Sequence, residues 1–182
     1  SRGLGDVYKR QGLDLAIRVR VPPLENTDLA VRPLGHSVRI LVASPTLVAT
    51  FPTPHSLNCL QAWPTLSMAN DGEKYTWQLL DEQGQRISLV HHPRLATDDL
   101  TSLRSAVLRG IGVAVLPREL VVADIDAGRL VQVLPGVSTA PGLVHAIFPT
   151  RRGMVPAVRH LLDALVVGLH RLNAESEQDV DR

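Results

Sequence analysis

The stretch that decides the fold is TDDLTSLRSAVLRGIGVAVLPRELVVADIDAGRLVQVLPG, residues 97–136. Its first apolar residues recur at helical spacing, and Gly110 stands where such a helix would end. A continuous apolar run follows over 111–116, the pattern of a buried strand. Pro117 favours the start of a second helix, which Gly128 ends before another apolar segment. Alternating helices and strands predict an α/β fold, and we expect mainly parallel pairing of its strands.

The same kinds of segment continue on both sides of this stretch. Proline at a first helical position predicts a short helix from Pro45 to about residue 51 and a long amphipathic helix from Pro156. The segment 52–75 is ambiguous, and the polar segment 173–182 is expected to be disordered. Apolar or alternating runs predict further strands over 13–19, 38–43 and 143–148, and a hairpin of 76–80 with 85–90.

The composition is that of an ordinary folded domain. Of 182 residues, 45% are hydrophobic and 20% charged, and the formal net charge is +1. These values argue against a disordered chain and against a stand-alone, strongly basic nucleic-acid binder. Cys59, the single cysteine, excludes an intrachain disulfide, and we interpret it as a small buried hydrophobe. No apolar run approaches the length of a membrane span, and we expect a cytoplasmic protein that makes no membrane contact.

Residues 1–11, SRGLGDVYKRQ, differ from the rest of the chain. They hold one of only two lysines, and the string GLGDVYKRQ resembles the translated remnant of a sequencing adapter. We expect this leader to be non-native, with a native polar loop as the alternative. Recovering the same codons from an intact gene would contradict that expectation.

Three strand-to-helix junctions share one design, in which an apolar strand is followed by a capping residue or proline and then a helix. They are Ala43-Ser44-Pro45, Ala96-Thr97-Asp98 and Leu116-Pro117-Arg118. At the carboxyl ends of strands, such junctions direct backbone N–H groups into a crevice, which suits a small carboxylate. Ordinary helix capping is the alternative interpretation. Arg18, at the end of the first strand, would offset the negative charge of Asp98 if it faces the same crevice.

No catalytic or metal-binding constellation stands out. Asp98 and Asp99 are adjacent in a first helical turn, where carboxylates usually serve the helix dipole rather than acid–base chemistry. His91 and His92 point to opposite faces of a strand without a ligand partner, so we interpret them as a solvated strand end. We therefore expect a binding protein without catalytic residues, metal or cofactor. Sequence context for a nucleophile is also lacking around His36, His55 and Cys59.

In their order along the chain, five segments resemble the effector-binding domain of LysR-type transcription regulators. Each motif is weak by itself, but the ordered set is specific and covers nearly all of residues 12–172. The segments are GLDLAIRV (12–19), RILVASPTLVATF (39–51), the hairpin beginning at Trp77, residues 97–136, and LVHAIFPTRRGMVPAVRHLLDAL (143–165).

The resemblance implies an α/β fold of the type 2 periplasmic-binding-protein class, with two lobes, two crossing hinge strands and an effector in the cleft. It maps residues 12–39 and 147–172 to the first lobe and residues 40–146 to the second. The crossings would lie near Val38–Ala43 and Val144–Phe148. The first lobe would be incomplete, because the family's opening β-α-β stretch does not appear in this sequence.

The resemblance also implies partners for the intact protein. The family's winged helix-turn-helix is missing from this chain, so DNA binding would belong to an intact homodimer or homotetramer. Helix N-termini favour a small anionic effector, whereas Asp98 and Asp99 leave a neutral or cationic one open. An extracytoplasmic solute-binding protein of the same fold is the alternative, which an upstream signal peptide would favour. The expected effector-binding residues are Arg18, Ser44, Pro45, Thr97, Asp98 and Pro117.

Overall fold

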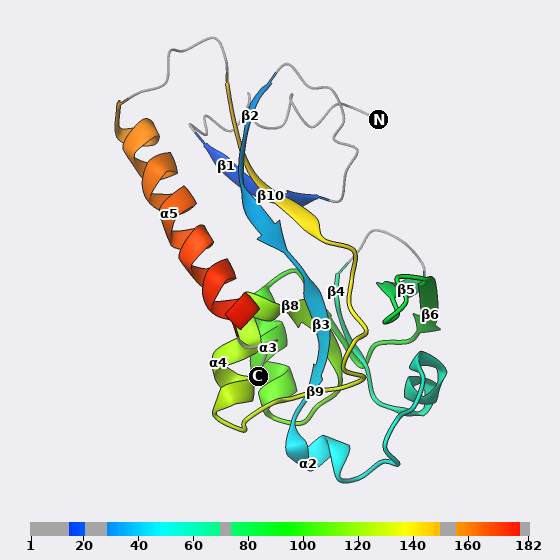
Figure 1. Cartoon of the computed structure of the whole chain (residues 1–182). Helices are drawn as coiled ribbons and strands as arrows, with labels where there is room; N and C mark the ends of the chain where they lie inside the picture. Colours follow the sequence, from blue (N-terminus) through cyan, green and yellow to red (C-terminus); the bar gives the residue numbers. More distant parts are fainter. Residues whose placement is uncertain (1–14, 21–28, 70–73, 150–155, 179–182) are drawn as a thin grey trace. The chain divides into compact units, whose positions relative to one another are not determined.

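A computed structural model describes residues 15–20, 29–69, 74–149 and 156–178 (Figure 1). The chain divides into two compact units, and each is described here by itself. The first unit comprises Ser1–Ser37 and Pro141–Arg182, and the second comprises Val38–Ala140. The leader 1–11 expected to be non-native lies outside the described residues.

The described part of the first unit is a three-stranded sheet and one long helix. Strand β10 (Gly142–Pro149) lies between β1 (Ala16–Arg20) and β2 (Leu29–Ser37) and pairs antiparallel with both. Helix α5 (Pro156–Gln178) packs on this sheet, and Leu162 is buried among apolar side chains of β2 and β10. The chain enters this unit at residue 141, and β10 pairs on both sides within it, whereas the resemblance led us to expect a crossing near Val144–Phe148.

Two elements of the first unit differ from the sequence predictions. Strand β2 was not predicted, because Pro33 and Gly35 interrupt its pattern; a register shift between Val144 and His145 lies opposite them. Helix α5 continues to Gln178, so the prediction of disorder is wrong for residues 173–178. That segment contains no proline or glycine and is rich in good helix formers.

The second unit is built around β3 (Arg39–Ala43), which pairs antiparallel with β8 (Ala114–Pro117) and with β9 (Val131–Gln132). Strand β4 (Leu66–Met68) pairs in parallel with β7 (Leu95–Thr97). The expectation of mainly parallel pairing is therefore wrong, because every strand ladder of the described residues other than β4–β7 is antiparallel.

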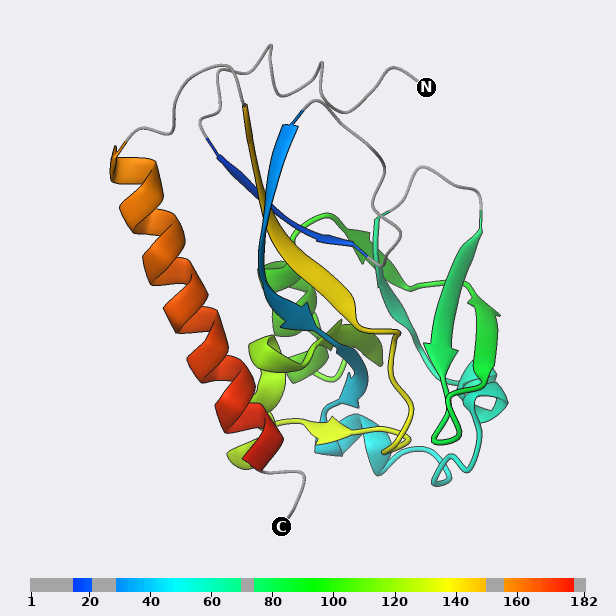
Figure 2. The same cartoon turned by 45° about the horizontal axis from the view of Figure 1, so that its top comes forward.

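Helices and a hairpin cover opposite faces of β3 (Figures 1 and 2). Helices α3 (Leu100–Leu108) and α4 (Arg118–Asp126) lie on one side. The hairpin of β5 (Tyr75–Leu80) and β6 (Arg86–His91) lies on the other, and its prediction is confirmed. The remaining described helical segments of this unit are α2 (Pro45–Val48) and the 3₁₀ helix η1 (Leu57–Ala62).

Alternation along β3 divides the core of the second unit into two clusters. Ile40 and Val42 belong to the cluster beneath α3 and α4. Leu41 and Ala43 belong to the cluster beneath the hairpin and η1, which also buries both tryptophans. This is the period of two expected of a strand buried on both faces. Within the described residues, no helix is long and apolar enough to cross a membrane.

Candidate functional site

The strands of the second unit end at two opposite ends of its sheet. Strand β4 runs parallel to β7, and the parallel bridge between Thr65 and Val113 shows that it also runs parallel to β8. The carboxyl ends of β4, β7 and β8 therefore share one end, which we call the carboxyl end of the sheet. Strand β3 runs antiparallel to β8, so its own carboxyl end lies at the other.

Thr97 and Asp98 lie at the carboxyl end of the sheet, where β7 leads into α3. The N-cap of α3 is Asp99, whose carboxylate accepts hydrogen bonds from the backbone N–H groups of Thr101 (3.2 Å) and Ser102 (2.8 Å). The hydroxyl of Ser102 donates to it as well, at 2.6 Å. These bonds lower the pKa of Asp99, and the bond from the Ser102 hydroxyl has the largest effect. Asp98 adds a second, exposed carboxylate.

Pro117 lies at the same end, where β8 leads into α4. It is buried and occupies the N-cap position, and no side chain caps this helix. Arg118 follows it, and Arg39 lies opposite it in the β3–β8 register, so two cations belong to this end. Strand β4 lies between β7 and β8, so the starts of α3 and α4 are separated by one strand. Sequence reasoning missed Arg39, because the first residue of an apolar strand carries no separate signal.

Ser44 and Pro45 lie at the opposite end of the sheet. Ser44 is 2% exposed, and its Oγ accepts a hydrogen bond from the backbone N–H of Leu47 at 3.2 Å, as an N-cap of α2. A Cβ placed on Gly110 would lie 3.0 Å from this Oγ, so Ser44 faces the end of α3 rather than its start. The structure does not bring Ser44 and Thr97 together, since β3 runs antiparallel to the strands that lead into α3 and α4.

A model of the family described as "LysR substrate binding domain" matches residues 4–168. This chain belongs to the LysR substrate-binding domain family. The match begins inside the leader 1–11 that the sequence sets apart.

The relatives of this LysR domain include named transcription regulators. It is 31% identical over 155 residues to the HTH-type transcriptional regulator PtxR of Pseudomonas aeruginosa, covering 85% of this chain and 49% of the relative. It is 30% identical over 167 residues to the regulator CrgA of Neisseria meningitidis, covering 91% of this chain and 54% of the relative. The chain thus spans about half the length of these curated relatives.

Solved regulatory domains have the same fold. The regulatory domain of CrgA from Neisseria meningitidis superposes with a TM-score of 0.75 at 29% identity, covering 93% of this chain and 81% of that one. The regulatory domain of AphB in Vibrio vulnificus gives 0.69 at 27% identity, covering 87% and 76%. The α/β fold of the type 2 periplasmic-binding class is thereby confirmed.

Arg18 of the LysR domain lies in β1 of the first unit. It is directly opposite His145 of β10 in the register, and His145 is 4% exposed. Partial burial first, and then the charge of Arg20, lower the pKa of Arg18. Arg18 therefore lies on the same face of the first sheet as Arg20 and His145.

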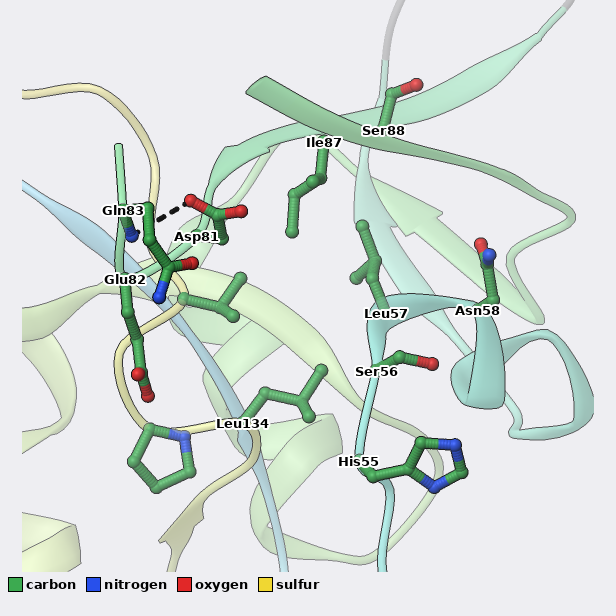
Figure 3. A pocket seen from close by; sticks show the side chains of 12 residues that line it. His55, Ser56, Leu57, Asn58, Asp81, Glu82, Gln83, Ile87, Ser88 and Leu134 are labelled. Carbon is green, nitrogen blue, oxygen red and sulfur yellow. Dashed lines mark hydrogen bonds between the residues drawn. The ribbon is translucent and has the colours of Figure 1, made fainter. Parts of the chain in front are cut away.

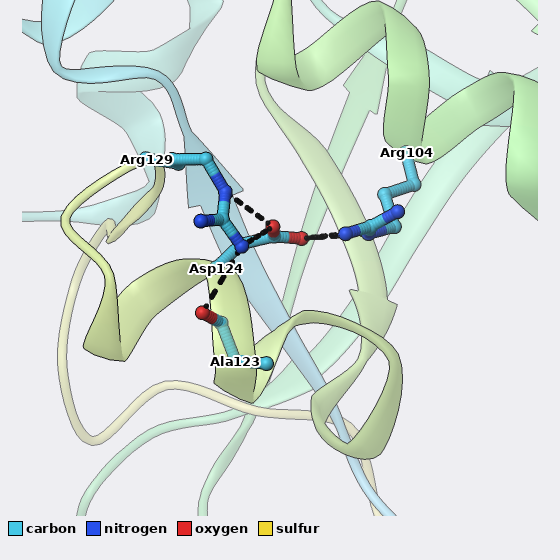
Figure 4. Close-up of polar contacts among 4 residues, drawn as sticks. All are labelled: Arg104, Ala123, Asp124 and Arg129. Atoms are coloured by element: carbon cyan, nitrogen blue, oxygen red, sulfur yellow. Dashed lines mark hydrogen bonds and ion pairs between the residues drawn. The ribbon is translucent and has the colours of Figure 1, made fainter.

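Asp124 fastens the two helices whose first turns lie at the carboxyl end of the sheet (Figure 4). Its side chain, on α4, is fully buried. One carboxylate oxygen accepts from Nε of Arg104 on α3 at 2.6 Å, and the other accepts two N–H groups of Arg129 at 2.9 and 2.7 Å. Removal from water would raise the pKa of Asp124, but hydrogen bonds from Arg129 and Arg104 outweigh it and lower the pKa.

Two other predictions about single residues need correction. His91 is 5% exposed rather than solvated, whereas His92 on the opposite face is exposed. Cys59 is only partly buried, and its Sγ lies 3.4 Å from Ser56 Oγ and 3.7 Å from the ring nitrogens of His55. Hydrogen bonding with the Ser56 side chain has the largest effect on the pKa of this thiol, and hydrogen bonding with the His55 backbone comes second; both lower it. Within the described part of the chain, no three metal-ligating side chains gather.

Proposed function

We propose that this LysR domain binds a small metabolite at the carboxyl end of the sheet in its second unit. The observation that carries the proposal is that α3 and α4 both begin there, at Thr97–Asp99 and at Pro117. Helix starts present N–H donors and a positive dipole end, which suit polar groups of a ligand. Ser44 and Pro45 are left out of the proposed site, and so is Arg18, because it belongs to the first unit.

The charges at this end favour an effector with two kinds of polar group. Asp99 already accepts N–H groups of the first turn of α3, and Asp98 adds a carboxylate, so a hydroxyl or amine donor suits that side. The first turn of α4 has no side-chain cap and carries one acidic residue, Glu119, but the two cations Arg39 and Arg118 outnumber it at this end, so an anion suits that side. We therefore propose a metabolite with a carboxylate directed toward α4 and a donor directed toward α3.

The intact protein, in this proposal, is a cytoplasmic, non-catalytic transcription regulator. Its DNA-binding segment lies outside this chain, and it acts as a homodimer or homotetramer. Effector binding would favour one conformation of the regulator over another and so change its action at the operator. The names of the relatives, which are transcriptional regulators, support this role and disfavour the solute-binding alternative.

Thr97→Ala tests the placement of the site. Losing one good hydrogen bond to a charged ligand costs roughly 1.5–3 kcal/mol, so candidate carboxylate metabolites should bind the variant about tenfold more weakly or worse. Isothermal titration of the intact regulator measures the affinity, and an operator-shift assay without effector should show unchanged DNA binding.

Two matched variants serve as controls. Thr101→Ala removes an exposed hydroxyl one turn further along α3 and should leave effector affinity unchanged. Ser44→Ala removes the N-cap of α2, which should lower the free energy of unfolding by about 1 kcal/mol without lowering the affinity for the effector. Equal effector affinity in Thr97→Ala and Thr101→Ala would refute the proposed site.

A further inference from the structure

A pocket of about 520 Å³ lies in the second unit, a volume typical of small-molecule sites. Three segments distant in sequence form it: the start of η1, the β5–β6 turn with the first part of β6, and residues 134–137 after β9 (Figure 3). Its lining includes none of the residues assigned to the carboxyl end of the sheet. It is thus separate from the proposed effector site.

Apolar side chains form the middle of this pocket. Ile87 and Leu134 approach it from opposite sides, and Leu57, the first residue of η1, lies on a third side (Figure 3). Leu57 is buried, and Ile87 and Leu134 pack against the hairpin-side core cluster. A ligand in this space would therefore cover apolar surface that the core holds in place.

One wall of the pocket is acidic. Asp81 and Glu82 lie on one side, facing the wall that carries His55 and Asn58 (Figure 3). Oδ1 of Asp81 accepts the backbone N–H groups of Gln83 (3.0 Å) and Gln85 (2.8 Å), which fixes the turn. The carboxylate of Glu82 has no hydrogen-bond or ion-pair partner among the described residues, and the lining contains no lysine or arginine.

The backbone beneath this wall is held in a strained conformation. Leu134 has a φ of 53°, a left-handed value that costs a non-glycine residue of order 1 kcal/mol or more. The Val137 N–H donates to its carbonyl at 3.0 Å, and Ser138 exchanges hydrogen bonds with Leu80 at 2.6 and 3.1 Å. A Cβ at Gly136 would collide with the Glu82 side chain, so glycine there leaves room for the acidic wall. Such over-determined strain is typical of binding sites.

We propose that this pocket is a second ligand site, which binds an organic cation with an apolar body. The ammonium or guanidinium group would lie on the side of the pocket that carries Asp81 and Glu82, and the apolar body would lie against Ile87, Leu134 and Leu57. An anion would face two carboxylates, and a neutral ligand would gain only the apolar contact.

Three probes of one shape test the charge preference: 2-phenylethylamine, 2-phenylethanol and phenylacetate. Titrated into the ¹⁵N-labelled chain, the amine should give saturable shifts at the pocket residues with a Kd in the millimolar range or below. The alcohol should bind more weakly, and the acid should not bind. Added salt should weaken the binding of the amine, because the acidic wall is accessible to solvent.

Asp81→Asn combined with Glu82→Gln removes both charges while keeping an acceptor for the turn. The amine should then bind about tenfold more weakly, with the alcohol unaffected, since an exposed carboxylate contributes at most a few-fold each. Asp126→Asn, which neutralises an exposed carboxylate on α4, is the matched control and should change nothing.

Several results would overturn the proposal: no saturable shift with the amine, equal binding of the three probes, shifts centred elsewhere, or an unchanged amine affinity in the double variant. Thr97→Ala should leave amine binding intact, so failure of the carboxyl-end site and failure of this pocket are distinguishable.

Discussion

His91 lies on β6 with its side chain in the core. Its Nδ1 is 2.8 Å from the hydroxyl of Thr65, and its ring centroid is 4.2 Å from that of Trp77. Nε2 is buried without a hydrogen-bond partner among the described residues. Burial first, and then the charge of His92, lower the pKa of His91 to about 4, so this imidazole is neutral at pH 7.

His91 should make the domain less stable as the pH falls from 7 toward 4. The unfolded imidazole takes up a proton near pH 6.5, whereas the folded one does so only near pH 4, so protons favour unfolding in this window. Between pH 7 and pH 5 the loss is about 2 kcal/mol. Urea unfolding should show this loss in wild type and in His92→Gln, and a smaller one in His91→Phe. Identical pH slopes in His91→Phe and wild type would contradict the assignment.

Residue types at helix starts could be predicted from the sequence, but their tertiary roles could not. The acidic start of α3 was recognised, yet the choice of Asp99 over Thr97 as cap depends on backbone angles that the letters do not fix. Burial of His91 was missed because alternation shows that two neighbours face opposite sides, not which side is the core. The ion pair of Asp124 could not be predicted from the sequence, because its partner Arg104 comes from another helix.

Elements were easier to locate than to orient. The hairpin and the α3–β8–α4 succession were predicted because turn residues and apolar periods are local signals. Ser44 was wrongly grouped with Thr97 because both junctions have the same local design, whereas the direction of β3 depends on its partners β8 and β9. Strand direction is a property of the whole sheet, so a capping motif alone does not tell at which end of the sheet it lies.

Asp124 should be the principal polar tie between α3 and α4. Removing one member of a buried ion pair costs 3–5 kcal/mol, and here about 2–3 kcal/mol is expected for Asp124→Asn, because Arg104 and Arg129 keep contact with water. Chemical denaturation at pH 7 measures the loss, with Asp126→Asn on the same helix as the control. A loss no larger than that of the control would show that the network contributes nothing.

The stability that the Asp124 ion pairs contribute should depend on pH in a defined way. The pKa of Asp124 is lowered in the folded protein, while an unfolded aspartate titrates near pH 3.9. Its contribution is therefore complete above about pH 5 and is lost as the pH falls through 3.9 toward the folded value. Asp124→Asn should accordingly differ most from wild type at neutral pH and converge with it in acid.

On the scale of the whole molecule, the second unit is one continuous stretch, Val38–Ala140, whereas the first is assembled from two. Both large core clusters lie entirely within this stretch. Its two ends are fastened together, because the Arg39 N–H donates to Thr139 Oγ1 at 3.0 Å and the Thr139 N–H donates to the Arg39 carbonyl at 2.9 Å. These features are those of a segment that can fold independently.

A fragment of residues 38–140 should therefore fold alone. Trp63 and Trp77 are 5% and 6% exposed, so their fluorescence should be blue-shifted in the fragment and shift red cooperatively in urea. Because the acidic pocket lies wholly inside this stretch, 2-phenylethylamine should bind the fragment as it binds the full chain. Asp124→Asn should lower the urea midpoint of the fragment and of the full chain alike. A fragment with exposed tryptophans and no cooperative transition would show instead that the second unit needs the first to fold.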